Sequence, residues 1–200
     1  MLRWRLLLGV IFAVVLSSWL WFDHNYCESL PGVWLVPLLV LLSILAAGET
    51  IALLKTESQG PSPAVVYTGS LAIALSPWLS ILVAQIPLSA LGWSFLAVGL
   101  SMVGATAHAV LTYRRESQAV LRLALTVFAM VYVGLLLHFV AQLRLIEEGG
   151  LGVIPILSLV IVVKMSDIGA YTVGRMIGKH KLAPELSPGK TLEGLAGGVA

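Results

Sequence analysis

Residues 33–54 read VWLVPLLVLLSILAAGETIALL, an apolar run of 22 residues in which Glu49 is the one charged residue. An α-helix rises about 1.5 Å per residue, so a run of this length crosses the hydrocarbon core of a bilayer, which is about 30 Å thick. The run therefore predicts a transmembrane helix. Glu49 lies close enough to one end of this helix to reach the membrane interface.

The composition of the whole chain agrees with a membrane protein. Of its 200 residues, 58% are hydrophobic and 11% are charged, and the mean hydropathy is +0.97. These values lie outside the range of soluble domains. The net charge of +2 says little by itself, because the distribution of Lys and Arg between loops determines membrane orientation. Cys27 is the only cysteine, which excludes an internal disulfide and a cysteine metal cluster.

Further apolar runs predict helices on both sides of this one. The first run ends in Trp19, Trp21 and Phe22, aromatic residues typical of a membrane interface rather than of a signal-peptide cleavage site. We predict an all-α polytopic membrane protein with about six complete transmembrane helices, a cytoplasmic polar loop and the start of a seventh helix. The six helices are expected near residues 6–22, 33–54, 65–84, 91–110, 119–143 and 152–166.

Loops assigned alternately to the two sides of the membrane differ strongly in positive charge. The side opposite the N-terminus carries Arg144 alone among Lys and Arg residues, together with four carboxylates. Because cytoplasmic loops are enriched in Lys and Arg, we predict that the N-terminus and the polar C-terminal stretch face the cytoplasm. The cations on that side are Arg3, Arg5, Lys55, Arg114, Arg115, Arg122, Lys164, Arg175, Lys179, Lys181 and Lys190.

The polar residues of the C-terminal part gather in Ser166–Gly198, which reads SDIGAYTVGRMIGKHKLAPELSPGKTLEGLAGG. Its cations alternate with glycines, where the backbone can approach a ligand closely. That combination suits phosphate oxygens. We therefore divide the chain into a transmembrane helical region, residues 1–164, and a cytoplasmic-face nucleotide- or phosphate-binding segment, residues 165–198. The cations concerned are Arg175, Lys179, Lys181 and Lys190, with His180 as a fifth candidate.

Other interpretations of this stretch and of the chain are weaker. A basic loop that meets anionic lipid headgroups explains the lysines and arginines but not Asp167. A P-loop ending at Gly189-Lys190-Thr191 needs a glycine five residues before Gly189, and that position is Pro184. A transporter or a non-catalytic membrane scaffold stays as the alternative function, although the sequence has no internal repeat and no pair of charged mid-membrane segments.

The stretch also has a distinctive order: Asp167, Ala170-Tyr171, Gly174-Arg175, Gly178-Lys179, Lys181-Leu182, Pro184, Ser187-Pro188, Lys190-Thr191, Glu193-Gly194 and Gly197-Gly198. This order resembles the central block of the bacterial phosphatidate cytidylyltransferases, or CDP-diacylglycerol synthases. The resemblance implies a multi-pass inner-membrane enzyme of phospholipid biosynthesis. Such an enzyme condenses CTP with phosphatidate to give CDP-diacylglycerol and pyrophosphate, with a divalent cation such as Mg²⁺ as cofactor.

The resemblance and the residue types together suggest roles for eight polar side chains of the stretch. Asp167, Lys190 and Glu193 are the expected catalytic residues. Asp167 would bind the metal, Lys190 would contact phosphate, and Glu193 would hold a lysine or join the metal shell. Hydroxyl groups would donate hydrogen bonds to phosphate oxygens, and a guanidinium would bind one phosphate group in bidentate fashion. The expected substrate-binding residues are Arg175, Lys179, Lys181, Ser187 and Thr191.

The resemblance also sets expectations for partners and completeness. The family's C-terminal signature, whose aspartates are the main expected metal ligands, would follow Ala200, so we expect this chain to be an incomplete fragment that is inactive by itself. CTP, phosphatidate and the lipid bilayer are the expected partners, and no nucleic acid is expected. A homodimer is a further candidate, with the small residues Gly92, Gly99 and Gly104 as its contact.

Overall fold

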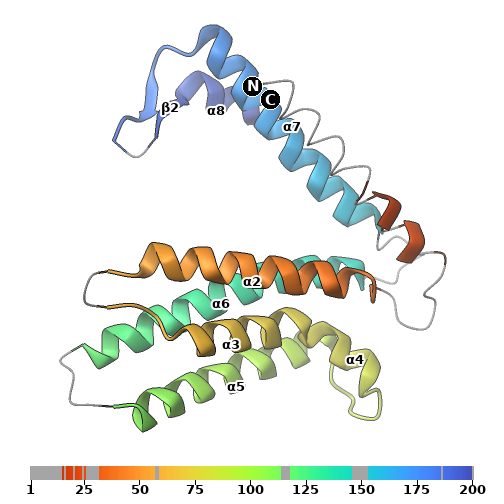
Figure 1. Cartoon of the computed structure of the whole chain (residues 1–200). Helices are drawn as coiled ribbons and strands as arrows, with labels where there is room; N and C mark the ends of the chain where they lie inside the picture. The colour runs from red at the N-terminus through yellow and green to blue at the C-terminus, as the bar shows by residue number, and fades with distance from the viewer. Residues whose placement is uncertain are drawn as a thin grey trace. The chain divides into compact units, whose positions relative to one another are not determined.

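The computed structural model describes residues 15, 17–19, 21–23, 25, 32–56, 59–113, 118–145, 153–185 and 187–199. The chain divides into two compact units (Figure 1). The bundle unit comprises Trp19–Val153, and the C-terminal unit contains Ile154–Ala200 together with residues 1–18. Most of the first predicted helix, residues 6–22, lies outside the described residues.

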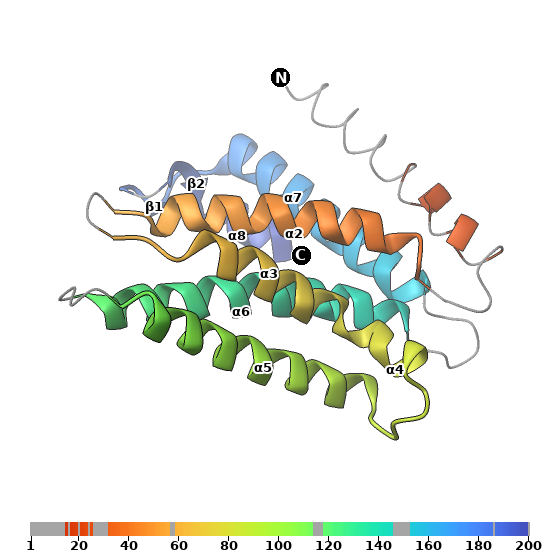
Figure 2. The same ribbon diagram turned by 60° about the horizontal axis from the view of Figure 1, so that its bottom comes forward.

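The bundle unit is built from long helices that pack side by side. Helix α3 packs against α2, α5 and α6. Figures 1 and 2 both show α2 and α5 on opposite sides of this bundle, with α3 and α6 between them. The elements are α2 (Leu35–Leu54), α3 (Pro63–Leu75), the 3₁₀ helix η1 (Ser76–Trp78), α4 (Leu79–Leu82), α5 (Ala90–Leu111) and α6 (Ala119–Arg144).

Local sequence sets the ends of these helices. Pro63 occupies the first position of α3, where its fixed φ suits a helix and its missing N–H costs no hydrogen bond. Pro77 lies in η1, so the α-helical ladder of α3 gives way to a 3₁₀ turn at this proline. Ser89 precedes α5, and its side chain accepts a hydrogen bond of 3.1 Å from the backbone N–H of Gly92. This N-cap fixes the start of α5.

Five described helices are long and apolar enough to cross a membrane. This observation confirms an all-α polytopic membrane architecture, while the total of six helices stays a prediction. The five segments overlap the runs predicted at residues 33–54, 65–84, 91–110, 119–143 and 152–166. They are Leu35–Leu54, Pro63–Leu82, Ala90–Leu111, Ala119–Arg144 and Val153–Ile177.

Small residues allow close packing in the middle of the bundle unit. Ala47, Val66, Ala129 and Val133 form one buried cluster that joins α2, α3 and α6. A hydrogen bond of 3.2 Å between the Oγ atoms of Ser43 and Ser70 connects α2 to α3. Small residues and interhelical hydrogen bonds of this kind hold helices together in lipid, where burial of apolar surface gives little driving force.

An ion pair closes one end of the bundle unit. The buried carboxylate of Asp23 lies 2.7 Å from Nη2 of Arg144 and accepts hydrogen bonds from the backbone N–H groups of Gly32 (2.8 Å) and Trp34 (3.2 Å). Gly32 has φ +83°, and a Cβ there would lie 3.0 Å from Cγ of Arg144 and from Cζ2 of Trp78. The chain needs glycine at this turn because both the backbone conformation and the space exclude a side chain.

The last membrane helix is longer than the sequence predicts. Helix α7 (Val153–Ile177) continues past residue 166, and it is followed by strands β1 (Lys181–Ala183) and β2 (Ser187–Thr191) and by helix α8 (Leu192–Val199). The expected polar loop is therefore the last turns of a helix, a small antiparallel hairpin and a short helix. No proline interrupts α7 after Pro155, which lies in its first turn, so the polar residues from Ser166 onward remain in the helix.

Candidate functional site

Glycines bring α7 and α8 into backbone contact within the C-terminal unit. The Oγ atom of Ser166 donates a hydrogen bond of 2.6 Å to the carbonyl oxygen of Gly198. A Cβ on Gly194 would lie 2.8 Å from the carbonyl oxygen of Ala170 and 3.1 Å from the Cα of Gly174. Ser166 contacts Gly198, and Ala170, one turn later in α7, contacts Gly194, one turn earlier in α8. The two helices therefore run antiparallel. The glycine spacing of the sequence therefore serves helix packing as well as any ligand.

Thr191 is the last residue of β2 and packs against α7. Its side chain is buried beside Gly174 and Gly178, and its Oγ1 accepts a hydrogen bond of 3.1 Å from the backbone N–H of Gly194. Gly194 is the third residue of α8, so Thr191 is an N-cap. The structure places this predicted phosphate ligand in a capping position inside the unit.

Glu193 closes the base of the hairpin. Its carboxylate accepts hydrogen bonds from the backbone N–H groups of Lys179 (3.1 Å) and His180 (3.2 Å), and Oε1 lies 2.7 Å from Nδ1 of His180. The hydrogen bond to the His180 side chain, followed by bonds from backbone N–H groups, lowers the pKa of Glu193 to about 2. The ionised carboxylate thus holds backbone and an imidazole. The sequence analysis predicts a lysine or a metal ion as the partner of Glu193, whereas its partners in the structure are the backbone of Lys179 and the backbone and ring of His180.

The predicted lysines are exposed on the hairpin and at its base. Lys181 pairs with Thr191 in the ladder, and Ser187 pairs with Ala183. Because side chains alternate along a strand, Lys190 projects from the face opposite to that of Thr191, away from the packed side. A Cβ on Gly189 would meet nothing within 4 Å. Lys181 is paired with Thr191 and therefore lies on the same face as Thr191, so Lys181 and Lys190 project from opposite faces of the hairpin. Exposed ammonium groups at and beside the hairpin suit an anionic ligand.

A second polar feature follows one face of α7. Asp167, Tyr171 and Arg175 recur every four residues, the spacing that places side chains on one helix face. Nη1 of Arg175 donates a hydrogen bond of 3.0 Å to the Tyr171 hydroxyl, and Asp167 is exposed. Tyr171 was not predicted as a site residue, although its spacing from Arg175 was visible in the sequence.

The structure does not bring Asp167 to the lysines. Asp167 lies ten residues before Ile177, where α7 ends, which corresponds to about 15 Å along the axis. Asp167 instead neighbours Ser166, which contacts the far end of α8. Within the described part of the chain, no group of three or more His, Cys, Asp or Glu side chains is arranged to hold a metal ion. Asp167 therefore belongs to no such group among the described residues.

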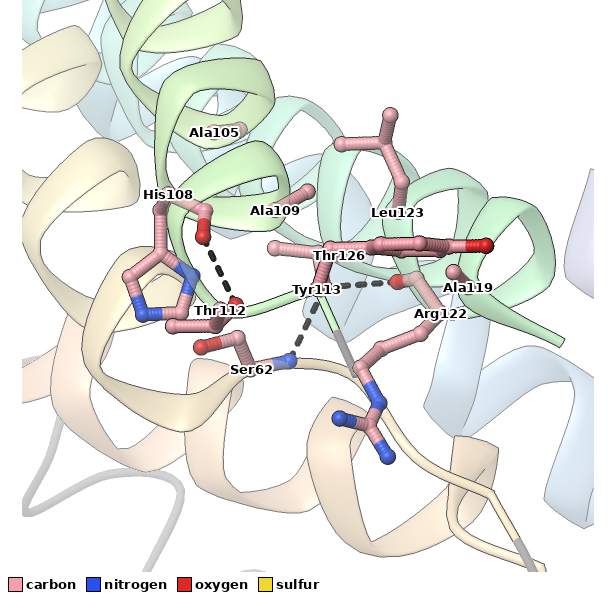
Figure 3. A pocket seen from close by; sticks show the side chains of 10 residues that line it. All are labelled: Ser62, Ala105, His108, Ala109, Thr112, Tyr113, Ala119, Arg122, Leu123 and Thr126. Carbon is pink, nitrogen blue, oxygen red and sulfur yellow. Dashed lines mark hydrogen bonds between the residues drawn. The ribbon is translucent and has the colours of Figure 1, made fainter. Parts of the chain in front are cut away.

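The bundle unit has a small cavity of about 30 Å³ near the start of α3 (Figure 3). The backbone N–H of Ser62 donates to Oγ1 of Thr126 (2.9 Å), which itself donates to the carbonyl oxygen of Arg122 (2.7 Å). His108 also lines the cavity. A volume of this size holds about one water molecule. We interpret it as a hydrogen-bonded junction between α3, α5 and α6, and we place the candidate site in the C-terminal unit.

Comparison with known proteins relates the chain to bacterial lipid enzymes. It is 42% identical over 71 residues to a phosphatidate cytidylyltransferase of Bacillus subtilis (strain 168), a stretch that covers 36% of this chain and 26% of the relative. It is 34% identical over 128 residues to a phosphatidate cytidylyltransferase of Staphylococcus saprophyticus, which covers 60% and 45% of the two chains. It is also 40% identical over 90 residues to a phosphatidate cytidylyltransferase of Mycobacterium leprae, and this stretch covers 45% of this chain and 26% of the relative.

These matches leave more than half of each relative uncovered, so the chain spans less than half the length of the curated relatives it matches. No solved structure matches the chain. The model of the cytidylyltransferase family matches residues 3–200, which includes the bundle unit and the C-terminal unit. The chain therefore belongs to the cytidylyltransferase family.

Proposed function

We propose that this protein is a phosphatidate cytidylyltransferase, which forms CDP-diacylglycerol and pyrophosphate from CTP and phosphatidate. The observation that carries the proposal is the hairpin between α7 and α8. Its lysines are exposed, while its base is fixed by Glu193 and Thr191. Membership of the cytidylyltransferase family and the names of the relatives support the same activity. Because the chain covers less than half of those relatives, we propose the activity for the whole protein.

The reaction is a displacement at phosphorus. A phosphate oxygen of phosphatidate attacks the α-phosphorus of CTP and forms a new P–O bond. The bond between the α-phosphorus and the bridging oxygen breaks, and its electron pair leaves with pyrophosphate. Such transfers depend on the position of the two phosphates and on neutralisation of their charge. Lys179, Lys181 and Lys190 would provide that neutralisation from the hairpin.

Two of the predicted site residues would act by positioning. Glu193 holds the backbone at Lys179 and His180, so it fixes the point from which the lysines extend. Thr191 caps α8 next to Lys190.

Ser187 opposes Ala183 in the ladder, and its hydroxyl is a candidate donor to a phosphate oxygen. Arg175 is held by Tyr171 and would bind a phosphate that lies along α7.

Magnesium is part of the proposal. Mg²⁺ is often bound by one or two carboxylates together with water and substrate phosphates, so the single exposed carboxylate of Asp167 fits one place in such a shell. When bound, the ion would neutralise charge on the phosphate oxygens. Residues outside those described, water and substrate would have to complete the coordination.

The proposed enzyme lies in a bacterial inner membrane. The excess of Lys and Arg on the N-terminal side of the predicted topology supports a cytoplasmic location for the hairpin. Phosphatidate would reach the site from the bilayer and CTP from the cytoplasm.

The decisive experiment is an assay of the protein expressed from its complete coding region and purified in detergent. We expect pyrophosphate release that requires CTP, phosphatidate and Mg²⁺ together. Lys190→Met should lower kcat/KM for CTP at least about tenfold, because a hydrogen bond to a charged group contributes roughly 1.5–3 kcal/mol. Lys55→Met, which removes an exposed lysine of the bundle unit, is the matched control and should leave the rate unchanged. Pyrophosphate release without phosphatidate, or no release at all, would overturn the proposal.

A further inference from the structure

The cations of the C-terminal unit fall into two groups. Lys179, Lys181 and Lys190 lie at or beside the hairpin, which follows the C-terminal end of α7 (Figure 1). Arg175 lies on α7 itself, a helix long and apolar enough to cross a membrane. The proposed reaction has two phosphate-bearing substrates, one that arrives from water and one that is anchored in the bilayer. Cations at different levels of the membrane can therefore bind different substrates.

The guanidinium of Arg175 points back along α7, away from the hairpin. Its Nη1 donates a hydrogen bond of 3.0 Å to the hydroxyl of Tyr171, which stands about one turn nearer the N-terminal end of the helix. Helix side chains tilt toward that end, and this bond fixes the tilt. Arg175 is exposed, and a guanidinium carries enough N–H donors to hold Tyr171 and a phosphate together.

The level of this guanidinium along α7 matches that of lipid headgroups. Tyr171 lies eighteen residues after Val153, where α7 begins, or about 27 Å along the helix axis. The hydrocarbon core is about 30 Å thick, so a helix that enters the core near Val153 leaves it near Tyr171. Tyrosine is typical of this interface. The guanidinium that Tyr171 holds is therefore at the depth of the phosphates of membrane lipids.

Apolar side chains continue the face of Arg175 toward the membrane core. Ile168 and Ile161 precede Arg175 at intervals of seven residues, a spacing of about two turns that keeps side chains on one helix face. They are 40% and 58% exposed. A cation at the interface with apolar surface below it matches a molecule that has an anionic head and an apolar tail.

Two further charges lie deeper on this side of α7. Lys164 and Asp167 are three residues apart in the sequence and both are exposed, so their opposite charges offset each other. Arg175 therefore gives this face its net positive charge. A phosphomonoester carries a charge of about −1.5 to −2 near neutral pH, more than the single charge of a phosphodiester. The face thus favours a lipid that ends in a phosphomonoester.

We propose that Arg175 binds the phosphate of phosphatidate, with Tyr171 as the residue that positions its guanidinium, and that the lysines at the hairpin hold CTP. This inference rests on the proposed function and names the substrate that α7 receives. A guanidinium suits the phosphate because it binds two oxygens at once. The diacylglycerol part lies along Ile168 and Ile161. The two phosphates approach each other from the membrane side and from the water side.

Binding of each substrate alone tests the assignment without turnover. The complete protein in detergent and magnesium buffer is titrated calorimetrically with dioctanoyl phosphatidate in the absence of CTP, and separately with CTP in the absence of lipid. Arg175→Met should weaken phosphatidate binding at least about tenfold, because hydrogen bonds to a charged group are lost, and should leave CTP binding unchanged. Weakened CTP binding with unchanged phosphatidate binding would overturn the inference and leave the proposed function intact.

A second lipid separates substrate recognition from general attraction to anions. Dioctanoyl phosphatidylglycerol is anionic but contains a phosphodiester, so its binding should be weak and insensitive to Arg175→Met. An equal loss of binding for both lipids would show a general contact with anionic lipid and would contradict a substrate site. Lys55→Met, the control for loss of an exposed cation, should change the binding of neither lipid.

Tyr171→Phe tests the positioning role, because it removes only the hydroxyl that accepts from Arg175. KM for phosphatidate should rise several-fold while kcat and KM for CTP stay unchanged. In the Arg175→Met background the same substitution should have no further effect, since the two side chains act as one unit. An equal effect in both backgrounds would overturn the positioning role. Lys190→Met should show the converse pattern, with KM raised for CTP alone.

Failure of this inference and failure of the proposed function give different results. If the unsubstituted protein binds phosphatidate through Arg175 but releases no pyrophosphate, the proposed function is wrong and the lipid site stands. If the unsubstituted protein binds no phosphatidate, both are wrong.

Discussion

Asp23 and Arg144 form a buried ion pair across 121 residues of sequence, with Nε of the guanidinium 2.7 Å from Oδ2 of the carboxylate. The carboxylate also binds two backbone N–H groups at the turn before α2. The pair therefore links the end of α6 to the start of α2. It also explains why a lone arginine is tolerated on the side of the predicted topology that carries few cations, since its charge is neutralised within the protein.

Breaking this pair should destabilise the bundle unit. Arg144→Met leaves the Asp23 carboxylate buried without a counter-charge, which costs about 3–5 kcal/mol. Asp23→Asn combined with Arg144→Met removes both charges and should recover much of that loss. Thermal unfolding in detergent measures both effects, and Lys55→Met is the control for loss of an exposed cation. A double variant as unstable as the single one would show that packing of the arginine stem, rather than charge, is responsible.

The contact between α7 and α8 should not accept a methyl group at Gly194. A Cβ there would lie 2.8 Å from the backbone carbonyl of Ala170, and such overpacking costs about 1–3 kcal/mol. Gly194→Ala should therefore accelerate hydrogen–deuterium exchange in α8. Gly189→Ala adds a methyl group where nothing lies within 4 Å and should leave exchange in α8 unchanged. Equal protection in the two variants would contradict the close helix contact.

Glu193 should titrate at unusually low pH. Its pKa is lowered from 4.5 to about 2, so the stability that its ionised form adds is present above pH 4.5 and is lost as the pH falls toward 2. The chemical shift of the Glu193 side-chain carboxyl carbon should follow this titration in micelles. His180→Ala removes the main cause of the shift and should move the midpoint upward, toward 4.5. An unchanged midpoint would assign the shift to the backbone N–H groups instead.

Two variants of Thr191 test whether its hydroxyl caps α8. Loss of its cap in Thr191→Ala should cost about 1 kcal/mol and loosen α8, whereas Thr191→Ser keeps the Oγ that accepts from Gly194. Exchange protection of α8 should therefore fall in the alanine variant and persist in the serine variant. If both variants lose protection equally, the methyl group of Thr191 against Gly178 is the stabilising contact.

The sequence predicted the membrane helices because each depends on local hydrophobicity alone. The run at Leu35–Leu54 is recognisable without knowledge of any other segment, and the same is true of Ala119–Arg144. The hairpin was less accessible. The polar residues from Ser166 onward are typical of a loop, but α7 continues to Ile177. A helix that leaves the apolar interior tolerates polar side chains on its exposed face.

The roles of individual polar residues in the C-terminal unit depend on tertiary contacts. Nothing local distinguishes Thr191 as a cap packed on α7 from Thr191 as a phosphate ligand, because its neighbours Gly174 and Gly178 come from another helix. The partners of Glu193 are likewise 13 and 14 residues away. Composition identified the segment as suited to phosphate, and the assignments of Lys190 and Asp167 stay predictions.

The closed base of the hairpin bears on how tightly it can hold an anion. Hydrogen bonds from Lys179 and His180 to Glu193 join the two ends of the segment, so the entropy of loop closure is lost when the chain folds. An arriving anion has to immobilise only lysine side chains, each at a cost of about 1.5–2 kcal/mol. If the hairpin binds phosphate as we propose, its affinity is limited by the rotamer freedom of the lysines and not by ordering of the main chain.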